Sequence, residues 1–139
     1  VVEAFTGGNI SQKLVGTSSP PFIQGVVLSS ENSQRQFLEL PGEAFNSLKE
    51  TPLRFTDSLA EKGRIESGGS LGLAVFGKIG EEQKKGEYRV ETYYPLSTAN
   101  GGENQEHALG GELWTVRERA SIIALDFVRK YLLTKKQSA

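Results

Sequence analysis

The sequence predicts an α+β domain in which four antiparallel strands and a helix are followed by four more strands and a longer helix. Two observations lead to this ββββα-ββββα fold class. Short apolar segments alternate with period two along much of the chain, which is the pattern of strands with one buried face. Two other segments repeat their apolar residues at helical spacing, and one of them ends the chain. We therefore expect one domain over the 139 residues, with two sheets and two helices.

The first ββββα unit is expected at residues 1–50. Its strands are predicted at 1–5, 10–15, 22–28 and 35–40. Pro41-Gly42 stops the last strand, and a short helix over Glu43–Glu50 follows it. Phe45 and Leu48 lie three residues apart in that segment and share one side of the helix.

The second unit is expected at residues 51–135, because Pro52 ends the first helix. Its strands are predicted at 53–55, 71–79, 88–94 and 113–114, with polar loops at 58–69 and 97–111 and a hairpin loop at 80–86. Period-two alternation is clearest in the strand that carries Leu71, Leu73, Val75 and Ile79 on one face. Because a following helix covers one face of such a sheet, the other face is left for water or a ligand.

The C-terminal helix has the clearest start signal, since Thr115 and Glu118 form a capping-box pattern. One apolar stripe, from Val116 to Tyr131, is expected to cover the sheet. A second stripe contains Leu125, Val128 and Leu132. We predict that this second stripe is an oligomer interface; a deeply buried helix in a monomer is the alternative. A short basic tail is expected at 136–139.

Composition excludes several kinds of chemistry. The chain has no Cys and one His, which excludes thiolate zinc sites, cysteine nucleophiles and multi-histidine metal sites. Gly68 to Gly72 resembles a phosphate loop only in glycine content, because it opens a strand rather than a helix. Glu103, Glu106 and His107 follow no recognised metal-ligand spacing. We therefore expect no enzyme activity, no metal and no cofactor. No apolar run approaches the length of a membrane-spanning helix.

The net charge of −1 conceals an uneven distribution. Residues 1–114 carry a net charge of −5, whereas residues 115–139 carry +4. Positive charge at the C-terminus of a helix is favoured by its dipole, so the basic end is explained without a ligand. The chain does not start with Met. We expect from this that a targeting peptide has been removed.

The outward face of the predicted sheets is the one constellation that indicates a ligand. Arg35, Arg54, Lys78 and Arg89 are each expected opposite the buried face of their strand. Phe76 and Tyr93 are expected on the same outward side. Cations between aromatic rings suit a single nucleic-acid strand, because cations contact phosphates and rings stack on bases. Lys13, Lys84 and Lys85 are expected to assist at the rim of this surface. A solvated sheet face with scattered aromatic residues is the alternative.

Two segments resemble the Whirly-type single-strand-binding superfamily. Residues 37–50 are similar to the step in which a strand ends in a small or proline-containing turn and a helix begins. Residues 114–133 are similar to the closing helix, with Phe127, Tyr131, Leu132 and Leu133 matching its final Phe-x-x-x-Tyr-Leu-Leu. Plant members carry a Lys-Gly-Lys-Ala stretch that this chain lacks. The resemblance therefore favours the kinetoplastid mitochondrial RNA-binding branch.

This resemblance implies a function and partners. It implies a protein that holds guide RNA across its sheets, mainly through phosphate contacts, and promotes annealing as a matchmaker in mitochondrial RNA editing. It also implies a tetramer with two kinds of subunit and a mitochondrial location. Because this chain is not basic overall, we expect the related second subunit to be more basic. The alternatives are single-stranded DNA binding like that of the plant proteins, and an assembly subunit that binds only protein.

Overall fold

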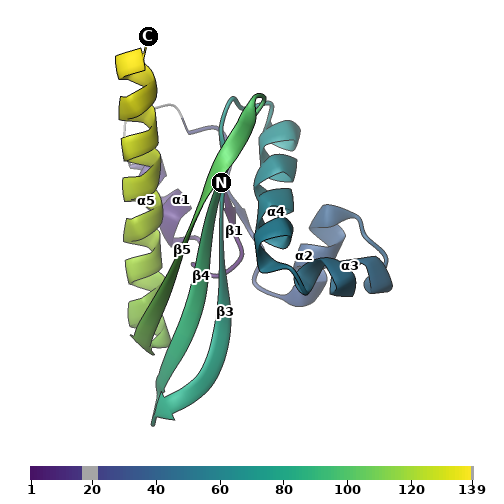
Figure 1. Cartoon of the computed structure of the whole chain (residues 1–139), viewed down its shortest axis with the longest axis vertical. Coiled ribbons are helices and arrows are strands. Elements are labelled where there is room, and N and C mark those ends of the chain that lie inside the picture. Colours follow the sequence, from purple (N-terminus) through teal and green to yellow (C-terminus); the bar gives the residue numbers. More distant parts are fainter. Residues whose placement is uncertain (17–21, 139) are drawn as a thin grey trace.

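The computed structural model describes residues 1–16 and 22–138. One mixed five-stranded sheet, in the order β2-β1-β3-β4-β5, forms the middle layer (Figure 1). The strands are β1 (Val2–Glu3), β2 (Val26–Val27), β3 (Gly72–Lys84), β4 (Glu87–Thr98) and β5 (Gly101–Glu112). β1 pairs in parallel with both β2 and β3, whereas β3, β4 and β5 form an antiparallel meander.

Helices cover both faces of this sheet (Figure 1). They are α1 (Asn9–Val15), α2 (Glu31–Leu38), α3 (Gly42–Lys49), α4 (Pro52–Ser67) and α5 (Leu113–Ser138). The crossover through α1 runs from β1 outward to β2, and the crossover through α2, α3 and α4 runs back past β1 to β3. Because crossovers between parallel strands are right-handed, connections in opposite directions place their helices on opposite faces. This explains why α1 lies with α5 on one face and α4 on the other.

The sheet separates two hydrophobic cores. The core on the α5 side joins Val75 and Tyr94 of the sheet to Ala120 of α5 and Ile10 of α1. The core on the α4 side is built from one further set of side chains: Val2, Ala4, Leu28, Phe45, Phe55, Leu59, Ala60, Ala74 and Phe76. Burial on both faces lets neighbouring residues of β3, such as Ala74 and Val75, both be fully buried.

The expected pair of four-stranded antiparallel sheets is therefore wrong. Residues 10–15 are helix α1, most of 35–40 lies in α2, and both 53–55 and most of the expected loop at 58–69 belong to α4. The expected strand at 22–28 is reduced to the two residues of β2. At the C-terminal side, the expected loop at 97–111 is mostly β5, and Leu113-Trp114 begins α5. In α1 and α4, apolar residues four apart pack into the cores, Ile10 with Leu14 and Phe55 with Leu59, and this spacing fits a helix. α2 begins instead at a capping box formed by Ser30 and Ser33.

Four elements are confirmed. The strand with period-two alternation from Leu71 is β3, and its return strand is β4. The helix expected at 43–50 is α3, which is shifted by one residue. The C-terminal helix is α5, which continues to Ser138. Among the described residues, no helix is both long and apolar enough to cross a membrane.

Candidate functional site

The four cations expected on one sheet face do not share a surface. Arg35 lies on α2, where its guanidinium donates to the side chain of Asn32 at 2.9 Å. Arg54 is an exposed residue of α4. Only Lys78 and Arg89 lie on the sheet, on β3 and β4, and Arg89 pairs with Glu91 at 3.3 Å. The expected open platform fails because the elements carrying Arg35 and Arg54 are helices.

The two aromatic residues expected to stack on bases lie in the α4-side core or at its edge. Phe76 is only 9% exposed and packs edge-to-face on Phe55 of α4. Tyr93 is half-buried and stacks on Phe76, with 6.4 Å between ring centroids. The face predicted to be open is therefore the face that α4 covers.

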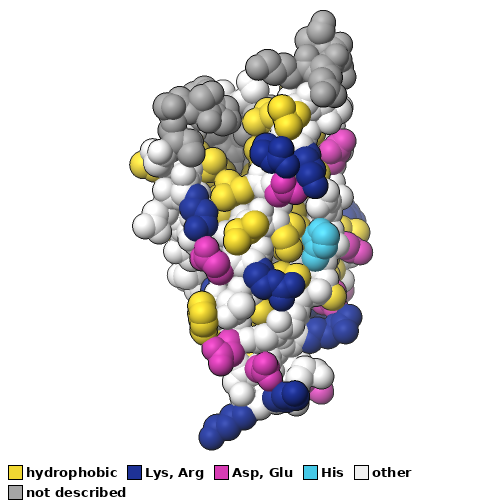
Figure 2. Space-filling model, turned by 90° about the vertical axis from the view of Figure 1, so that its left-hand side faces the viewer, with side chains coloured by type: hydrophobic (Ala, Val, Ile, Leu, Met, Phe, Trp, Pro, Cys, Tyr) yellow, Lys and Arg dark blue, Asp and Glu magenta, His cyan; other side chains and the backbone are white. Residues whose placement is uncertain are grey.

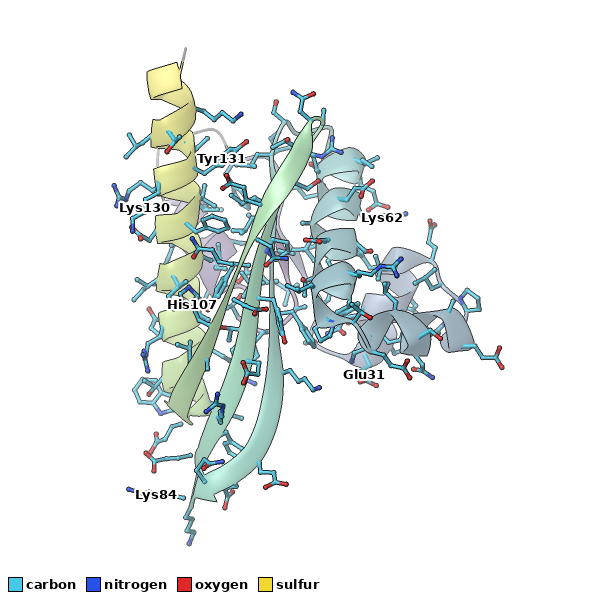
Figure 3. All side chains as sticks on the ribbon, in the orientation of Figure 1. Glu31, Lys62, Lys84, His107, Lys130 and Tyr131 are labelled. Atoms are coloured by element: carbon cyan, nitrogen blue, oxygen red, sulfur yellow. The ribbon has the colours of Figure 1, made fainter. Side chains whose placement is uncertain are left out.

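The remaining predicted residues are also dispersed. Lys13 lies on α1 and pairs with Glu118 of α5 at 3.0 Å. Lys84 and Lys85 lie at the turn between β3 and β4, and Figure 3 shows Lys84 at the far end of this hairpin. Leu125, Val128 and Leu132 are half-buried and line an apolar cavity of about 250 Å³ beside α1. Their role as an oligomer interface stays a prediction.

The outer face of α5 mixes side chains of every kind. Figure 2 shows hydrophobic side chains there among Lys, Arg, Asp and Glu, with His107 at one side. Glu103, Glu106 and His107 lie on β5, the edge strand, rather than in a loop. Within residues 1–16 and 22–138, no group of three histidine or acidic side chains is placed to hold a metal ion.

A cavity of about 620 Å³ lies beyond the carboxyl ends of the parallel strands. We call it the carboxyl-end cavity. Its walls come from the ends of β1 and β2, the middle of β3 just after its pairing with β1, the loop to α1, the start of α2, and single residues of α3, α4 and α5. Ligands of open α/β sheets bind at this edge, because the loops that leave neighbouring strands there diverge to opposite faces. The position and volume of the cavity suit a small molecule.

Glu3 organises the loop at the bottom of this cavity. α1 begins after Gly7 and Gly8, which both have positive φ, and its N-cap offers no side-chain acceptor. The buried Glu3 carboxylate instead accepts hydrogen bonds from the backbone amides of Ile10 and Ser11, each at 2.9 Å. Burial acts to raise the pKa of Glu3, but hydrogen bonds from Ser11, Thr6 and Ile10 together outweigh it and hold that pKa below its ordinary value. Glu3 is thus a fixed anion, and its carboxylate oxygens are engaged in capping α1.

The charge left for a ligand is positive. Lys49, Lys78 and Arg117 line the cavity, and its carboxylates are Glu3 and Glu31. Arg117 is held in place, because its Nε donates to the carbonyl oxygen of Phe5 at 3.0 Å and its guanidinium lies 5.1 Å from the Phe5 ring centroid. The lining therefore carries three cations against two carboxylates, and the Glu3 carboxylate already accepts hydrogen bonds from the amides at the start of α1.

Apolar side chains form the rest of the wall. Phe5, Leu28, Phe76 and Ile79 are among them. Phe5 approaches β3 closely because Gly77 has no side chain: a Cβ there would lie 2.6 Å from the Phe5 ring. The cavity thus offers an apolar body and cationic positions to a single small molecule.

Sequence reasoning missed this cavity. Its signal is the glycine pair that follows Val2–Thr6 and precedes α1, because a strand, a glycine pair and a helix in succession are typical of ligand loops in α/β folds. The expectation that 10–15 is a strand hid that order. The contributions of Lys49 and Arg117 come from distant segments, and no local pattern marks them.

Fold and site together define a three-layer α/β domain with a cavity of small-molecule size beyond its parallel strands. The chain belongs to the CinA C-terminal domain family, which matches residues 1–132. Among curated relatives, a "CinA-like protein" of Geotalea uraniireducens is 27% identical over 141 residues, covering 99% of this chain and 34% of the relative. A "putative competence-damage inducible protein" of Desulforamulus reducens is 28% identical, covering 97% of this chain and 33% of the relative. The chain therefore spans about a third of these relatives' length.

Solved structures show the same fold. A competence damage-inducible protein A of Klebsiella pneumoniae matches with a TM-score of 0.78 at 20% identity, covering 95% of this chain and 84% of that one. A competence/damage-inducible protein of Agrobacterium tumefaciens matches with a TM-score of 0.71 at 18% identity, covering 93% and 81%.

The resemblance to the Whirly superfamily and its kinetoplastid branch is therefore wrong. The functions that this resemblance implied are also wrong, because the CinA family match covers nearly the whole chain. They are guide-RNA binding, matchmaking in RNA editing and the plant-like DNA-binding alternative. The two segments that carried the resemblance, 37–50 and 114–133, span α2–α3 and α5. An apolar segment, a proline turn and an amphipathic helix occur in many folds, so their similarity did not identify one.

Proposed function

We propose that this domain binds a small molecule in the carboxyl-end cavity, and that the ligand carries an anionic group on a compact apolar or aromatic body. The observation that carries the proposal is the composition of one 620 Å³ cavity, in which Lys49, Lys78 and Arg117 stand beside apolar walls. Apolar surface supplies most of the affinity in such sites, and a few charged groups fix orientation.

We also propose that the domain binds this ligand without transforming it. Thr6 is a hydroxyl residue beside the cavity with a carboxylate partner, because it donates to Glu3 at 2.5 Å. A useful general base has a pKa near the working pH, whereas the pKa of Glu3 is held low by the donors around it. This pair therefore serves to cap α1 rather than to activate a nucleophile.

The experiment is an NMR titration of the ¹⁵N-labelled chain with phenyl phosphate, and with benzyl alcohol as the neutral counterpart. We expect phenyl phosphate to shift amides in 5–8, 29–34 and 76–79, and to bind more tightly than benzyl alcohol. Lys78→Gln should weaken phenyl phosphate binding by about threefold to tenfold, the usual range for one charge contact.

Arg54→Gln is the matched control, because Arg54 is an exposed cation on α4 that does not line the cavity. Equal weakening by both variants would indicate general attraction to positive charge. Shifts confined to other parts of the chain would contradict the proposed site.

A further inference from the structure

Lys49 is held in an unusual place for a lysine. It ends α3, and its ammonium lies 5.5, 5.7 and 5.6 Å from the ring centroids of Phe45, Phe55 and Phe76. These rings pack edge-to-face in sequence, with centroids 5.8 Å and 5.0 Å apart. Contact with the faces of several rings attracts a cation and reduces its freedom to move. The rings belong to the buried α4-side core, so the position of Lys49 is set by the core itself.

The partner of Lys49 is held much less firmly. Glu31 is the first residue of α2, directly after the N-cap Ser30, and its Oε1 lies 2.6 Å from Lys49 Nζ. The Glu31 side chain is 77% exposed, whereas that of Lys49 is 21% exposed. Both residues line the carboxyl-end cavity, and Figure 3 shows Glu31 beside the α2 and α3 helices. The Lys49 ammonium is therefore held in one position, whereas the Glu31 carboxylate can rotate away from it into the solvent.

We infer that Lys49 is the anion anchor of the carboxyl-end cavity, and that Glu31 is a built-in competitor that a ligand's anionic group must displace. This inference rests on the proposed function. Displacement is inexpensive because an exposed carboxylate regains its hydration when it leaves an ion pair. Lys49 stays in place because the three rings hold it. The ligand class that follows is one whose anion reaches Lys49 while its apolar body contacts Phe76.

Charges near this pair agree with the assignment. The hydrogen bond and positive charge of Lys49 hold the pKa of Glu31 below its ordinary value, so Glu31 is charged and competes at neutral pH. Arg117 is already engaged by the carbonyl oxygen of Phe5. Lys78 is exposed on β3, so it assists an anion from the solvent side. Lys49 thus differs from the other two cations of this cavity, because core aromatic rings hold its ammonium and its ion-pair partner, Glu31, is exposed.

The test measures phenyl phosphate affinity by isothermal titration calorimetry for the wild-type chain and for Glu31→Gln, Lys49→Met and their combination. Glu31→Gln removes the competitor, and we expect it to tighten binding by about two- to fivefold, the usual worth of an exposed ion pair. Lys49→Met should weaken binding by about tenfold, the usual effect of losing a hydrogen bond to a charged group. In the combined variant, Glu31→Gln should no longer tighten binding.

Glu43→Gln is the matched control, since Glu43 is an exposed carboxylate in the first turn of α3 and does not line the cavity. If Lys49→Met does not fold, Lys49→Arg replaces it, and we expect Glu31→Gln to tighten binding in that background as well. Equal affinities for wild type, Glu31→Gln and Glu43→Gln, together with loss of binding in Lys78→Gln, would overturn the inference and leave the proposed function standing. Absence of phenyl phosphate binding in every variant would overturn both.

Discussion

Glu3 shows how one side chain can couple a strand to the helix that follows it. The residue lies in β1, and it is fully buried. Its carboxylate replaces the side-chain cap that Gly8 cannot provide for α1. An anion at a helix N-terminus satisfies free amides and interacts favourably with the helix dipole. In the sequence, Glu3 is only a polar residue in an apolar segment, so its role was not predictable there.

Glu3→Gln tests this role through the pH dependence of stability. The folded-state pKa of Glu3 is below its ordinary value, so its ionised form stabilises the fold above the unfolded-state pKa. That stabilisation is lost as pH falls through the folded-state pKa. The Gln amide places a donor against the amides of Ile10 and Ser11, so we expect a loss of about 1–3 kcal/mol at pH 7.

The measurement is urea unfolding at pH 7 and at pH values below 4. The difference between wild type and Glu3→Gln should be largest at pH 7 and should shrink in acid. Glu43→Gln, at an exposed position in the first turn of α3, should change stability at pH 7 by no more than about 0.5 kcal/mol. A difference that stays constant with pH would show that the Glu3 charge does not stabilise α1.

At the scale of elements, α4 is the longest segment at which the predicted fold is wrong. Pro52 is expected to end one helix, but it is the first residue of the next, a position at which proline is favoured. Leu53 and Phe55 alternate like a short strand, yet Phe55 and Leu59 are four residues apart and both are fully buried. Three polar residues separate Phe55 from Leu59, so the short segment 53–55 by itself shows no helical spacing.

The contact between α4 and β3 requires a glycine. A Cβ at Gly72 would lie 2.3 Å from the carbonyl oxygen of Ala60 and 2.8 Å from Arg64 Cβ, both in α4. Backbone atoms cannot turn aside as a flexible side chain can. We expect Gly72→Ala to destabilise the domain by about 1–3 kcal/mol, measured by urea unfolding.

Gly110→Ala is the matched control within a strand, because the nearest atom to a Cβ at Gly110 is the Tyr88 carbonyl oxygen at 3.9 Å. It should change stability by less than about 0.5 kcal/mol. Similar effects of both variants would contradict the close approach of α4 to β3.

At the scale of the whole molecule, the two cores lie over only part of the sheet. Leu73 to Phe76 of β3 are buried, whereas residues 80–86, around the β3–β4 turn, are exposed (Figure 1). The meander therefore extends beyond the helices that cover its other end. Regions with few buried apolar contacts open at lower free energy than the core.

Native-state hydrogen exchange checks this difference. We expect amides in residues 73–76, 90–94 and 96 to exchange most slowly, at rates near global unfolding, and amides in 80–86 to exchange by local opening. Exchange from 80–86 at the same rate as from 73–76 would show that the extended meander is part of the main cooperative unit.

The sequence by itself determined the antiparallel pair β3–β4, helix α3 and the long helix α5, because each depends on a local pattern: period-two alternation, a proline turn, or an apolar stripe at helical spacing. The cap expected at Thr115 is wrong, because α5 begins at Leu113 and Thr115 lies inside it. Only the tertiary structure decided that both faces of the sheet are covered, because α1 and α4 pack on opposite sides of β1 and β3. It also decided the site. Glu3, Lys49 and Arg117 are far apart in the chain, and they line one cavity because α3 and α5 pack on opposite faces of the sheet beside the carboxyl end of β1.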